Sequence, residues 1–266
     1  MISKLKIDYK IRYKDVGQGP VILLLHGYLE SLKVWNILVD ELKNDFRIIA
    51  PDLPGHGHSE VSEEIQTMDS MAEAIMHMLY HLNIDKCFVI GHSMGGYVAL
   101  AFLEKYPKLV KGISLFHSSP FADTEEKKHS RDREIELIKA GKKAQIYNLH
   151  TPKTFADENV SRFTEQIEKL KSTAKKTDNN GIIAVLEGMK ARPDRSGLLK
   201  NTLVPVQYII GAKDNFIPMQ ILDKLELPKG TDIVVLENSG HMGMFEEKEK
   251  SLEAITRFVK KNVVTD

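Results

Sequence analysis

The sequence predicts an α/β protein with one mostly parallel β-sheet and helices on both of its faces. Short apolar runs alternate with longer segments of helical spacing in the first half of the chain, which is typical of β-α-β units. One run, VILLLHG at residues 21–27, begins with an uninterrupted apolar stretch, as expected of a strand buried on both faces. The length of 266 residues suits a single sheet of this kind that carries an insertion.

The expected strands form one sheet of eight. Residues 6–17 (KIDYKIRYKDVG) alternate polar and apolar side chains and predict an antiparallel leading pair. Further apolar runs predict parallel strands at residues 21–27, 46–52, 87–93, 109–117, 204–214 and 231–241. Helical spacing predicts helices over 32–43, 69–82 and 249–261, the second of them opened by a capping box of Ser70 and Glu73.

Residues 121–197 differ in texture from the rest of the chain, because they are rich in Lys, Glu and Asp with helical apolar spacing. We interpret them as a helical lid inserted into a core formed by residues 1–120 and 198–266. Both flanking strands are expected to be parallel, so the lid should start and end at the carboxyl edge of the sheet. Its apolar stripe should face the core: Val160, Phe163, Ile167 and Leu170. The side chains expected to line a pocket are Phe121, Leu149, Phe155, Phe163 and Met189.

Composition narrows the class of partner. Lys plus Arg and Asp plus Glu both number 37, so the formal net charge of zero argues against nucleic acid or an anionic membrane as partner. No apolar run approaches the roughly 18 residues of a membrane span, and the first residues lack the apolar core of a signal peptide. The single cysteine, Cys87, opens a predicted buried strand. We expect a cytoplasmic protein that acts on a small molecule, and the sequence leaves its oligomeric state open.

The stretch GHSMGG places Ser93 where a predicted strand meets a predicted helix. A serine at such a sharp turn is held in a strained backbone conformation that aims its hydroxyl outward. Side chains at Gly91, Gly95 or Gly96 would collide with the neighbouring strand and helix. The free N–H groups at the start of the helix also point toward Ser93. The pattern therefore predicts an activated serine nucleophile.

With these motifs in place, the sequence resembles the α/β-hydrolase family, in the branch of lidded esterases, lactonases, perhydrolase-like enzymes and carbon-carbon hydrolases. The landmarks that carry the resemblance are LLLHGYLES, PDLPGHGHSE, GHSMGGYVAL, IIGAKDNFIP and NSGHMGMFEE, and they span nearly the whole chain outside the lid. The resemblance implies the chain order nucleophile, acid, histidine. Serine rather than aspartate at the nucleophile position excludes the alkyl-ester route of dehalogenases and epoxide hydrolases.

A serine hydroxyl needs a positioned base, and the base needs a carboxylate that fixes its tautomer. Four histidines follow Ser93, of which only His241 lies in a glycine-flanked loop after a late strand; the others are His117, His129 and His150. The resemblance assigns the acid to Asp214 in GAKDNFIP. Asp123 and, more weakly, Glu237 are the alternatives.

The negative oxygen formed by attack needs two backbone N–H donors. Met94, directly after the nucleophile, supplies one, and the resemblance assigns the other to Tyr28 in HGYLES, a loop that His26 and Gly27 shape. His92, beside the nucleophile, is expected to be structural. The predicted activity is hydrolysis of a small carboxylic ester, thioester or lactone through an acyl-enzyme on Ser93. A carbon-carbon hydrolase, or a ligand-binding receptor that keeps the triad without turnover, is the alternative.

We expect neither a metal nor another cofactor. Asp52, His56 and His58 lie close together in PDLPGHGHS, but the two glycines and two prolines of that stretch predict a tight turn rather than a metal site. Arg192 and Arg195, where the lid returns to the sheet, are expected to anchor the lid or face solvent, with a substrate carboxylate as the alternative partner.

Overall fold

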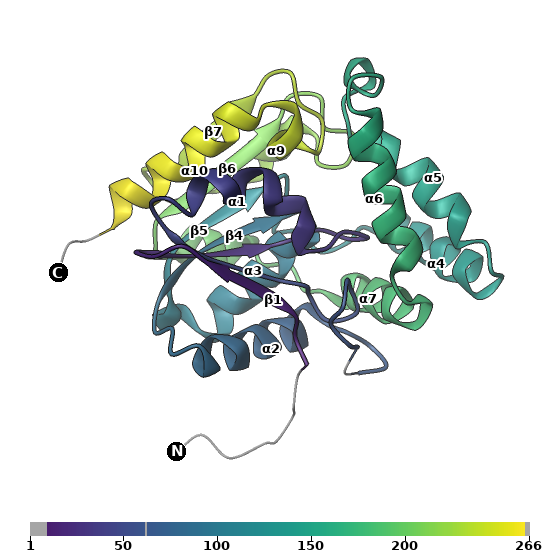
Figure 1. Cartoon of the computed structure of the whole chain (residues 1–266), viewed down its shortest axis with the longest axis horizontal. Helices are drawn as coiled ribbons and strands as arrows, with labels where there is room; N and C mark the ends of the chain where they lie inside the picture. The colour runs from purple at the N-terminus through teal and green to yellow at the C-terminus, as the bar shows by residue number, and fades with distance from the viewer. Residues whose placement is uncertain (1–9, 62, 264–266) are drawn as a thin grey trace.

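The computed structural model describes residues 10–61 and 63–263, and the described strands form one sheet in the order β1-β3-β2-β4-β5-β6-β7 (Figure 1). The strands are β1 (Tyr13–Val16), β2 (Val21–Leu25), β3 (Arg47–Pro51), β4 (Cys87–His92), β5 (Val110–Phe116), β6 (Val206–Gly211) and β7 (Asp232–Leu236). β1 pairs antiparallel with β3, and all other pairs are parallel. Residues 6–9 of the expected leading pair lie outside the described residues, so the described sheet has seven strands rather than eight.

Alternate residues of the central strands enter two separate cores because successive side chains of a strand point to opposite faces. Leu23 and Leu25 of β2 pack with α2 (Met68–His81) and α3 (Met94–Lys105). Ile22 and Leu24 pack with α1 (Asn36–Leu42) and α10 (Lys248–Asn262) on the other face. Both faces of the sheet are therefore covered (Figure 1). Outside the insert, the chain also forms four short helices: η1 (Leu32–Trp35), η2 (Pro107–Leu109), η4 (Met219–Lys224) and α9 (Gly243–Glu246).

The start of α2 corrects one expectation. Thr67, rather than Ser70, is the N-cap, and its side chain accepts a hydrogen bond from the backbone N–H of Ser70 at 3.0 Å. Glu73 instead pairs with Lys105 of α3 at 3.6 Å. The helix starts earlier than predicted because the Thr67 hydroxyl can also cap a helix and lies three residues before Ser70.

The segment 121–197, called the insert below, contains no strand and stands at one end of the sheet (Figure 1). Its elements are α4 (Glu125–Lys139), α5 (Lys143–Lys153), η3 (Asp157–Asn159), α6 (Thr164–Lys176), α7 (Asn179–Ala191) and the start of α8 (Ser196–Asn201). Phe163 and Ile167 of the predicted stripe are buried with residues of the α1/α10 core, and Val160 and Leu170 pack against the same cluster. The stripe thus joins the insert to the core.

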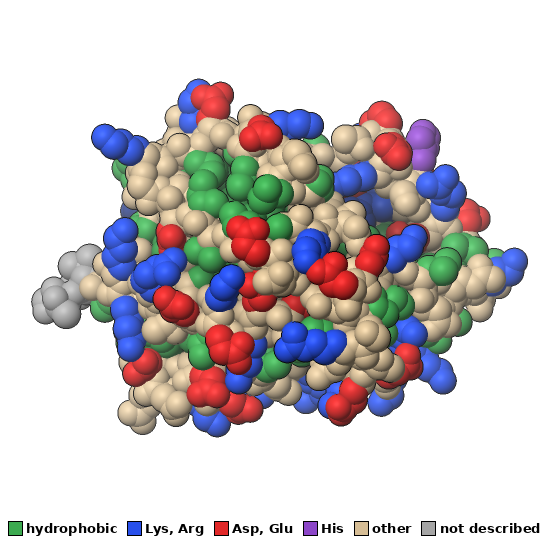
Figure 2. All heavy atoms as spheres, turned by 90° about the horizontal axis from the view of Figure 1, so that it is seen from above, with side chains coloured by type: hydrophobic (Ala, Val, Ile, Leu, Met, Phe, Trp, Pro, Cys, Tyr) green, Lys and Arg blue, Asp and Glu red, His purple; other side chains and the backbone are tan. Residues whose placement is uncertain are grey.

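The surface carries charges of both signs. Lys, Arg, Asp and Glu side chains are intermingled over the face seen in Figure 2, in keeping with the zero net charge. Among the described residues, no helix has the length and apolar character that crossing a bilayer requires.

Candidate active site

Ser93 lies at the turn between β4 and α3. Its backbone has φ 51° and ψ −118°, a strained conformation for a residue with a side chain. Hydrogen bonds hold the turn on both sides: the Ser93 N–H donates to the carbonyl of Phe116 at 3.0 Å, and the Ser118 hydroxyl donates to the Ser93 carbonyl at 2.7 Å. The strain is therefore maintained by contacts with the neighbouring strand β5 and the loop after it.

The glycines around Ser93 are required by close backbone approach. A Cβ at Gly91 would lie 2.4 Å from the Gly95 carbonyl oxygen, and one at Gly95 would lie 2.2 Å from the carbonyl oxygen of Leu25 in β2. A Cβ at Gly96 would meet the Ser118 hydroxyl at 2.2 Å. Each distance is far below van der Waals contact, so the turn cannot form with larger residues.

His241 and Asp214 come together at the same edge of the sheet. The Nδ1 of His241 lies 2.8 Å from Oδ2 of Asp214, and the other carboxylate oxygen accepts the N–H groups of Phe216 and Ile217 at 2.8 and 2.9 Å. Burial by itself raises the pKa of Asp214, but His241 and His117 outweigh burial and hold that pKa well below its ordinary value. Asp214 is therefore an ionised carboxylate that orients His241 through Nδ1–H, and Ser93 lines the same cavity as His241.

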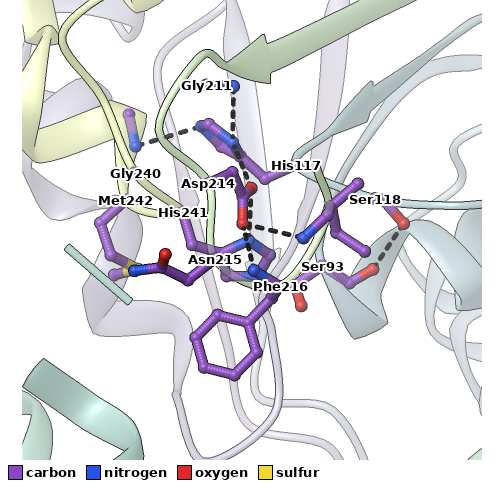
Figure 3. Close-up of polar contacts among 12 residues, drawn as sticks. Ser93, His117, Ser118, Gly211, Asp214, Asn215, Phe216, Gly240, His241 and Met242 are labelled. Atoms are coloured by element: carbon purple, nitrogen blue, oxygen red, sulfur yellow. Dashed lines mark hydrogen bonds and ion pairs between the residues drawn. The ribbon is translucent and has the colours of Figure 1, made fainter. Parts of the chain in front are cut away.

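His117 places a second imidazole on the same carboxylate, a contact that the sequence analysis did not predict. Its Nδ1 lies 3.1 Å from Oδ2 of Asp214, so that the carboxylate stands between His117 and His241 (Figure 3). The N–H of Gly243 points at Nε2 of His117 and the N–H of Gly211 points at Nδ1, each at 3.2 Å. We assign the proton of the neutral ring to Nδ1, because this nitrogen also faces the Asp214 carboxylate, which can only accept. Burial lowers the pKa of His117 to about 4. A neutral His117 therefore donates to Asp214. The position of His117 directly after a predicted buried strand was the sequence signal that could have identified it.

His117, Asp214 and His241 are also close enough together to be considered as metal ligands. The hydrogen bonds do not suit that use. Both imidazoles turn Nδ1 toward Oδ2 of Asp214, and the N–H of Gly243 occupies Nε2 of His117. Backbone N–H groups of Gly211 and Gly243 point at the two ring nitrogens of His117, so the three side chains fit a hydrogen-bonded cluster better than a metal centre.

Two further histidines brace the loops around Ser93. Nε2 of His92 lies 2.9 Å from the carbonyl oxygen of His241, and its Nδ1 lies 3.1 Å from Oε2 of Glu30, which also accepts the Gly27 N–H at 2.7 Å. His26 accepts the Leu53 N–H at Nε2, 2.9 Å away. His92 thus connects the loop that carries His241 to the loop after β2.

The charges on Glu30 and His92 support this contact. Burial by itself lowers the pKa of His92, but the charge of Glu30 outweighs it and raises that pKa. Burial by itself raises the pKa of Glu30, but His92 outweighs it and brings that pKa to about 2. The pair is therefore stable as carboxylate and imidazolium.

The candidate metal cluster of PDLPGHGHS is a braced turn. Asp52 accepts the backbone N–H groups of Leu32 and His58 at 2.8 and 2.9 Å, and Nε2 of His56 accepts that of Leu29 at 3.3 Å. A Cβ at Gly57 would lie 2.3 Å from a carboxylate oxygen of Asp52, so the turn closes tightly around that side chain.

Asp123, the alternative acid, lies on the insert side. Its carboxylate is held by Arg131 of α4 and by Arg192, whose Nη1 lies 2.7 Å away. Glu237, the weaker alternative, is exposed. Arg192 also places its guanidinium carbon 3.9 Å from the centre of the Tyr97 ring.

Arg195 joins the end of the insert to the core. It bonds Asp69 of α2 at 2.8 Å and Glu104 of α3 at 2.9 Å. Arg192 and Arg195 are both buried and both paired within the protein. Each one thus serves as an anchor of the insert, which was the expectation weighed against a substrate contact.

The cavity that contains Ser93 and His241 has a volume of 170 Å³. Met189 is the one predicted pocket residue that lines it. Phe155 and Phe163 instead stack on each other with ring centres 5.5 Å apart in the α1/α10 core, and Leu149 is 66% exposed. Phe121 is half-buried and is not a lining residue; its carbonyl accepts from Arg192. These four predicted side chains therefore do not line this cavity, and Phe155 and Phe163 instead join the insert to the core.

Polar residues of the insert form that wall instead. The α4 residues Lys127, Ser130, Arg131 and Glu134 line the cavity, together with His150 of α5. Glu134 accepts a hydrogen bond from the hydroxyl of Tyr28 at 3.0 Å, so helix α4 contacts the loop after β2. Burial raises the pKa of Glu134. The sequence pattern gave no signal for this wall, because Lys and Glu on a helix normally mark a solvated face.

Contacts with the insert also hold the loop that carries His241. The backbone N–H of His241 donates to the carbonyl of Thr154 at 2.7 Å, and a Cβ on Gly240 would lie 2.5 Å from the backbone nitrogen of Ala156. Buried Glu246 accepts the N–H groups of Ala156 and Gly240 at 2.8 and 2.9 Å. The Glu246 carboxylate, for which the sequence analysis predicted no role, thus links the insert to the loop that carries His241.

Comparison with known proteins identifies the family. Residues 20–248 match the model of the alpha/beta hydrolase fold. The chain belongs to the α/β-hydrolase fold family. An esterase from Thermogutta terrifontis, solved with malate bound, is 30% identical to this hydrolase; the match covers 96% of this chain and 94% of that one, with a TM-score of 0.91. An AB hydrolase superfamily protein of Bacillus subtilis is 28% identical, with 92% and 93% of the two chains covered.

A more distant neighbour shares the architecture. An enol-lactonase from Burkholderia xenovorans is 20% identical, with a TM-score of 0.86 and 94% and 96% of the two chains covered, a likeness that shows the fold. The predicted fold class and family are thus confirmed, and the protein is an esterase-like hydrolase.

Proposed function

We propose that this hydrolase cleaves small carboxylic esters through an acyl-enzyme on Ser93, with His241 as base and Asp214 as the acid that orients it. The observation that carries the proposal is the 2.8 Å contact between Nδ1 of His241 and Oδ2 of Asp214 beside the cavity that Ser93 lines. This contact leaves Nε2 of His241 free to take the proton of a serine hydroxyl.

The proposed reaction has two halves. The Ser93 oxygen bonds the ester carbonyl carbon while His241 takes the hydroxyl proton; the carbon-oxygen bond to the alcohol then breaks, and His241 returns the proton to the departing oxygen. In the second half, water bonds the acyl carbon while His241 takes a proton from the water; the bond from that carbon to the Ser93 oxygen then breaks, and His241 returns the proton to that oxygen. Each cycle releases one alcohol and one carboxylic acid, and Ser93 is restored.

The negative oxygen of each half-reaction would accept hydrogen bonds from the backbone N–H groups of Tyr28 and Met94. Both residues line the cavity with Ser93. Met94 is the first residue of α3, where a backbone N–H has no partner within the helix. Two donors set in place before the reaction stabilise charge that develops only as the bond forms.

The size of the cavity favours a short acyl group. Its 170 Å³ lies below the roughly 300–1,000 Å³ typical of pockets for drug-sized ligands. Its polar insert wall favours esters with few apolar atoms over long-chain lipids. We therefore propose acetyl and propionyl esters, or a lactone of similar size, as the substrate class, and we propose that the insert acts as the lid of the site.

A fluorophosphonate probe and a panel of p-nitrophenyl esters test the proposal. We expect wild-type protein to be labelled and to hydrolyse the acetate faster than the octanoate. Ser93→Ala should lose labelling, and both Ser93→Ala and His241→Ala should lose at least about 10³-fold in kcat. More than about a tenth of wild-type activity in either variant would contradict the assignment.

The same panel separates the alternatives. Cleavage of a vinylogous diketone, with p-nitrophenyl esters left intact, would identify a carbon-carbon hydrolase. A protein that neither labels nor turns over any ester would instead be a ligand-binding member of the fold. The restrained His241–Asp214 pair gives us the reason to expect turnover.

A further inference from the structure

A second cavity lies outside the active site, where the insert meets the core. It has a volume of 720 Å³, against 170 Å³ for the cavity at Ser93, and falls within the roughly 300–1,000 Å³ of ligand pockets. One wall comes from α6, and the other comes from η1, the start of α1, the 57–58 turn and Phe245. α6 and α1, which face each other across this cavity, can be found in Figure 1.

The lining of this cavity is apolar on one part and cationic on another. Val34, Ile37, Leu170 and Phe245 supply apolar surface, of which Val34 is buried and the other three are half-buried. Arg12, Lys33, Lys169 and Lys176 supply positive charge, and no lining residue is Asp or Glu. The composition differs from that of the face seen in Figure 2, where charges of both signs are mixed.

Two of these cations have no ion-pair partner within the described part of the chain. Lys169 pairs with Glu165 at 2.6 Å, and Arg12 lies 3.6 Å from Asp52. Lys33 and Lys176 form no ion pair with any described residue, and they stand on opposite walls: Lys33 on η1 of the core and Lys176 at the end of α6. An anion between them would contact the core and the insert at once.

We propose that this cavity binds an aliphatic monocarboxylate, with the carboxylate between Lys33 and Lys176 and the chain on the apolar surface of Ile37, Leu170 and Phe245. Ion pairs to exposed lysines are weak, so the chain must supply most of the affinity. Each buried methylene strengthens binding about fourfold. A carboxylate with a chain of eight to ten carbons therefore binds, and acetate does not. The bound molecule joins α6 to the core, so it holds the insert in place.

The carboxylate of the ligand and its aliphatic chain are both needed for binding. A neutral alcohol of the same length leaves the two lysines without a partner, and a cationic amphiphile faces four positive side chains. Inorganic phosphate offers charge but nothing to cover the apolar surface. These molecules provide probes that separate charge recognition from hydrophobic contact.

Calorimetric titration of the full chain with decanoate tests the proposal. We expect one bound molecule per chain, with the Kd increasing with salt concentration. The double variant K33Q/K176Q should bind at least tenfold more weakly. Lys175→Gln is the matched control, because Lys175 is the exposed neighbour of Lys176 and does not line the cavity; it should bind within twofold of wild type. Decanol and decyltrimethylammonium should each bind at least tenfold more weakly than decanoate.

Tryptophan fluorescence gives a second readout. Trp35 is the only tryptophan of the chain and lies between the lining residues Val34 and Asn36. Decanoate should change its emission in wild type and in Lys175→Gln, at the concentrations that saturate the calorimetric signal. The readout needs no turnover, so it is independent of the proposed esterase activity.

Three results would overturn the proposal. The first is no binding of decanoate up to its solubility limit. The second is equal affinity of K33Q/K176Q and wild type, which would place the molecule elsewhere, for example near Ser93. The third is equal affinity for decyltrimethylammonium, which would show that hydrophobic contact alone accounts for binding and that the lysine charges play no part. Ile37→Asn removes apolar surface without touching the lysines and should also weaken binding, so the test holds if the double variant folds poorly.

Discussion

The sheet edge and the insert form opposite walls of one cavity, and they hold their side chains in different ways. On the sheet edge, backbone geometry fixes Ser93, and hydrogen bonds to buried backbone groups fix Asp214. On the insert, the wall includes helix side chains such as Arg131 and Glu134, which are held by hydrogen bonds to other side chains. The sheet edge therefore provides a rigid catalytic geometry, whereas the insert provides a wall that substitutions can change without unfolding the core.

A substitution at the acid should have the largest effect. Asp214→Asn replaces an acceptor of two imidazole N–H groups by an amide that presents its own N–H to one of them, so His241 loses its orientation. We expect kcat to fall about 10³- to 10⁴-fold with the fold intact. Esterase kinetics and circular dichroism on the same sample measure both.

Asp123→Asn is the control for this result. It weakens the contacts of Arg131 and Arg192 and should lower the melting temperature, because it leaves buried guanidinium groups without a counter-charge. Its kcat per folded molecule should stay within about tenfold of wild type. An equal loss of kcat in the two variants would mean that the insert wall is as much a part of the catalytic geometry as the sheet edge.

Truncation of the insert's buried aromatic contact should affect stability and leave specificity unchanged. Phe155 is fully buried against Phe163, so Phe155→Ala should cost about 3–5 kcal/mol of the free energy of unfolding. Leu149→Ala, on an exposed side chain of the same insert, should change it by less than about 0.5 kcal/mol. Urea unfolding measures both. If folded Phe155→Ala preferred acyl groups in a different order of length, Phe155 would have to influence the substrate pocket.

His117 should make the sheet edge sensitive to pH. The folded protein holds the pKa of His117 at about 4, against an ordinary value of 6.5 that applies in the unfolded chain. Between these pH values the unfolded chain binds a proton that the folded protein does not, so the free energy of unfolding falls as the pH decreases. This group accounts for up to about 3 kcal/mol of that fall.

His117→Asn tests this dependence, since Asn tolerates the φ of 49° at this position. The variant should be less stable than wild type at pH 8, and the difference should shrink as the pH approaches 4. Urea unfolding at pH 8, 6 and 5 measures it. A difference that stays constant with pH would assign His117 a packing role alone.

The smallest effect is expected at Met189, which lines the cavity from the insert. Met189→Ala enlarges the cavity beside Ser93. The ratio of kcat/KM for a butyrate ester to that for an acetate ester should increase about two- to tenfold, because one or two methylenes gain room. An unchanged ratio would place the acyl group against the sheet edge instead.

Residues whose role is local in the chain could be predicted. The glycines around Ser93 indicate the strand-turn-helix because their constraint acts between neighbouring residues, and the buried strands read as apolar runs. The contact between Asp214 and His241 was expected from the resemblance to a family, since the two residues lie 27 positions apart. His117 and Glu246 carried no such signal, because their partners come from distant loops.

The sequence by itself thus determined the parallel sheet, the strand-turn-helix around Ser93 and the existence of a helical insert, each of which follows from periodicity and backbone sterics. Only the tertiary structure decided how the insert uses its side chains. Phe155 is part of the core rather than of the pocket, and Lys127 and Glu134 line the cavity, although Lys and Glu on a helix normally mark a solvated face. The physical reason is that a helix can bury any face that its neighbours cover, and those neighbours are fixed by packing between segments far apart in the chain.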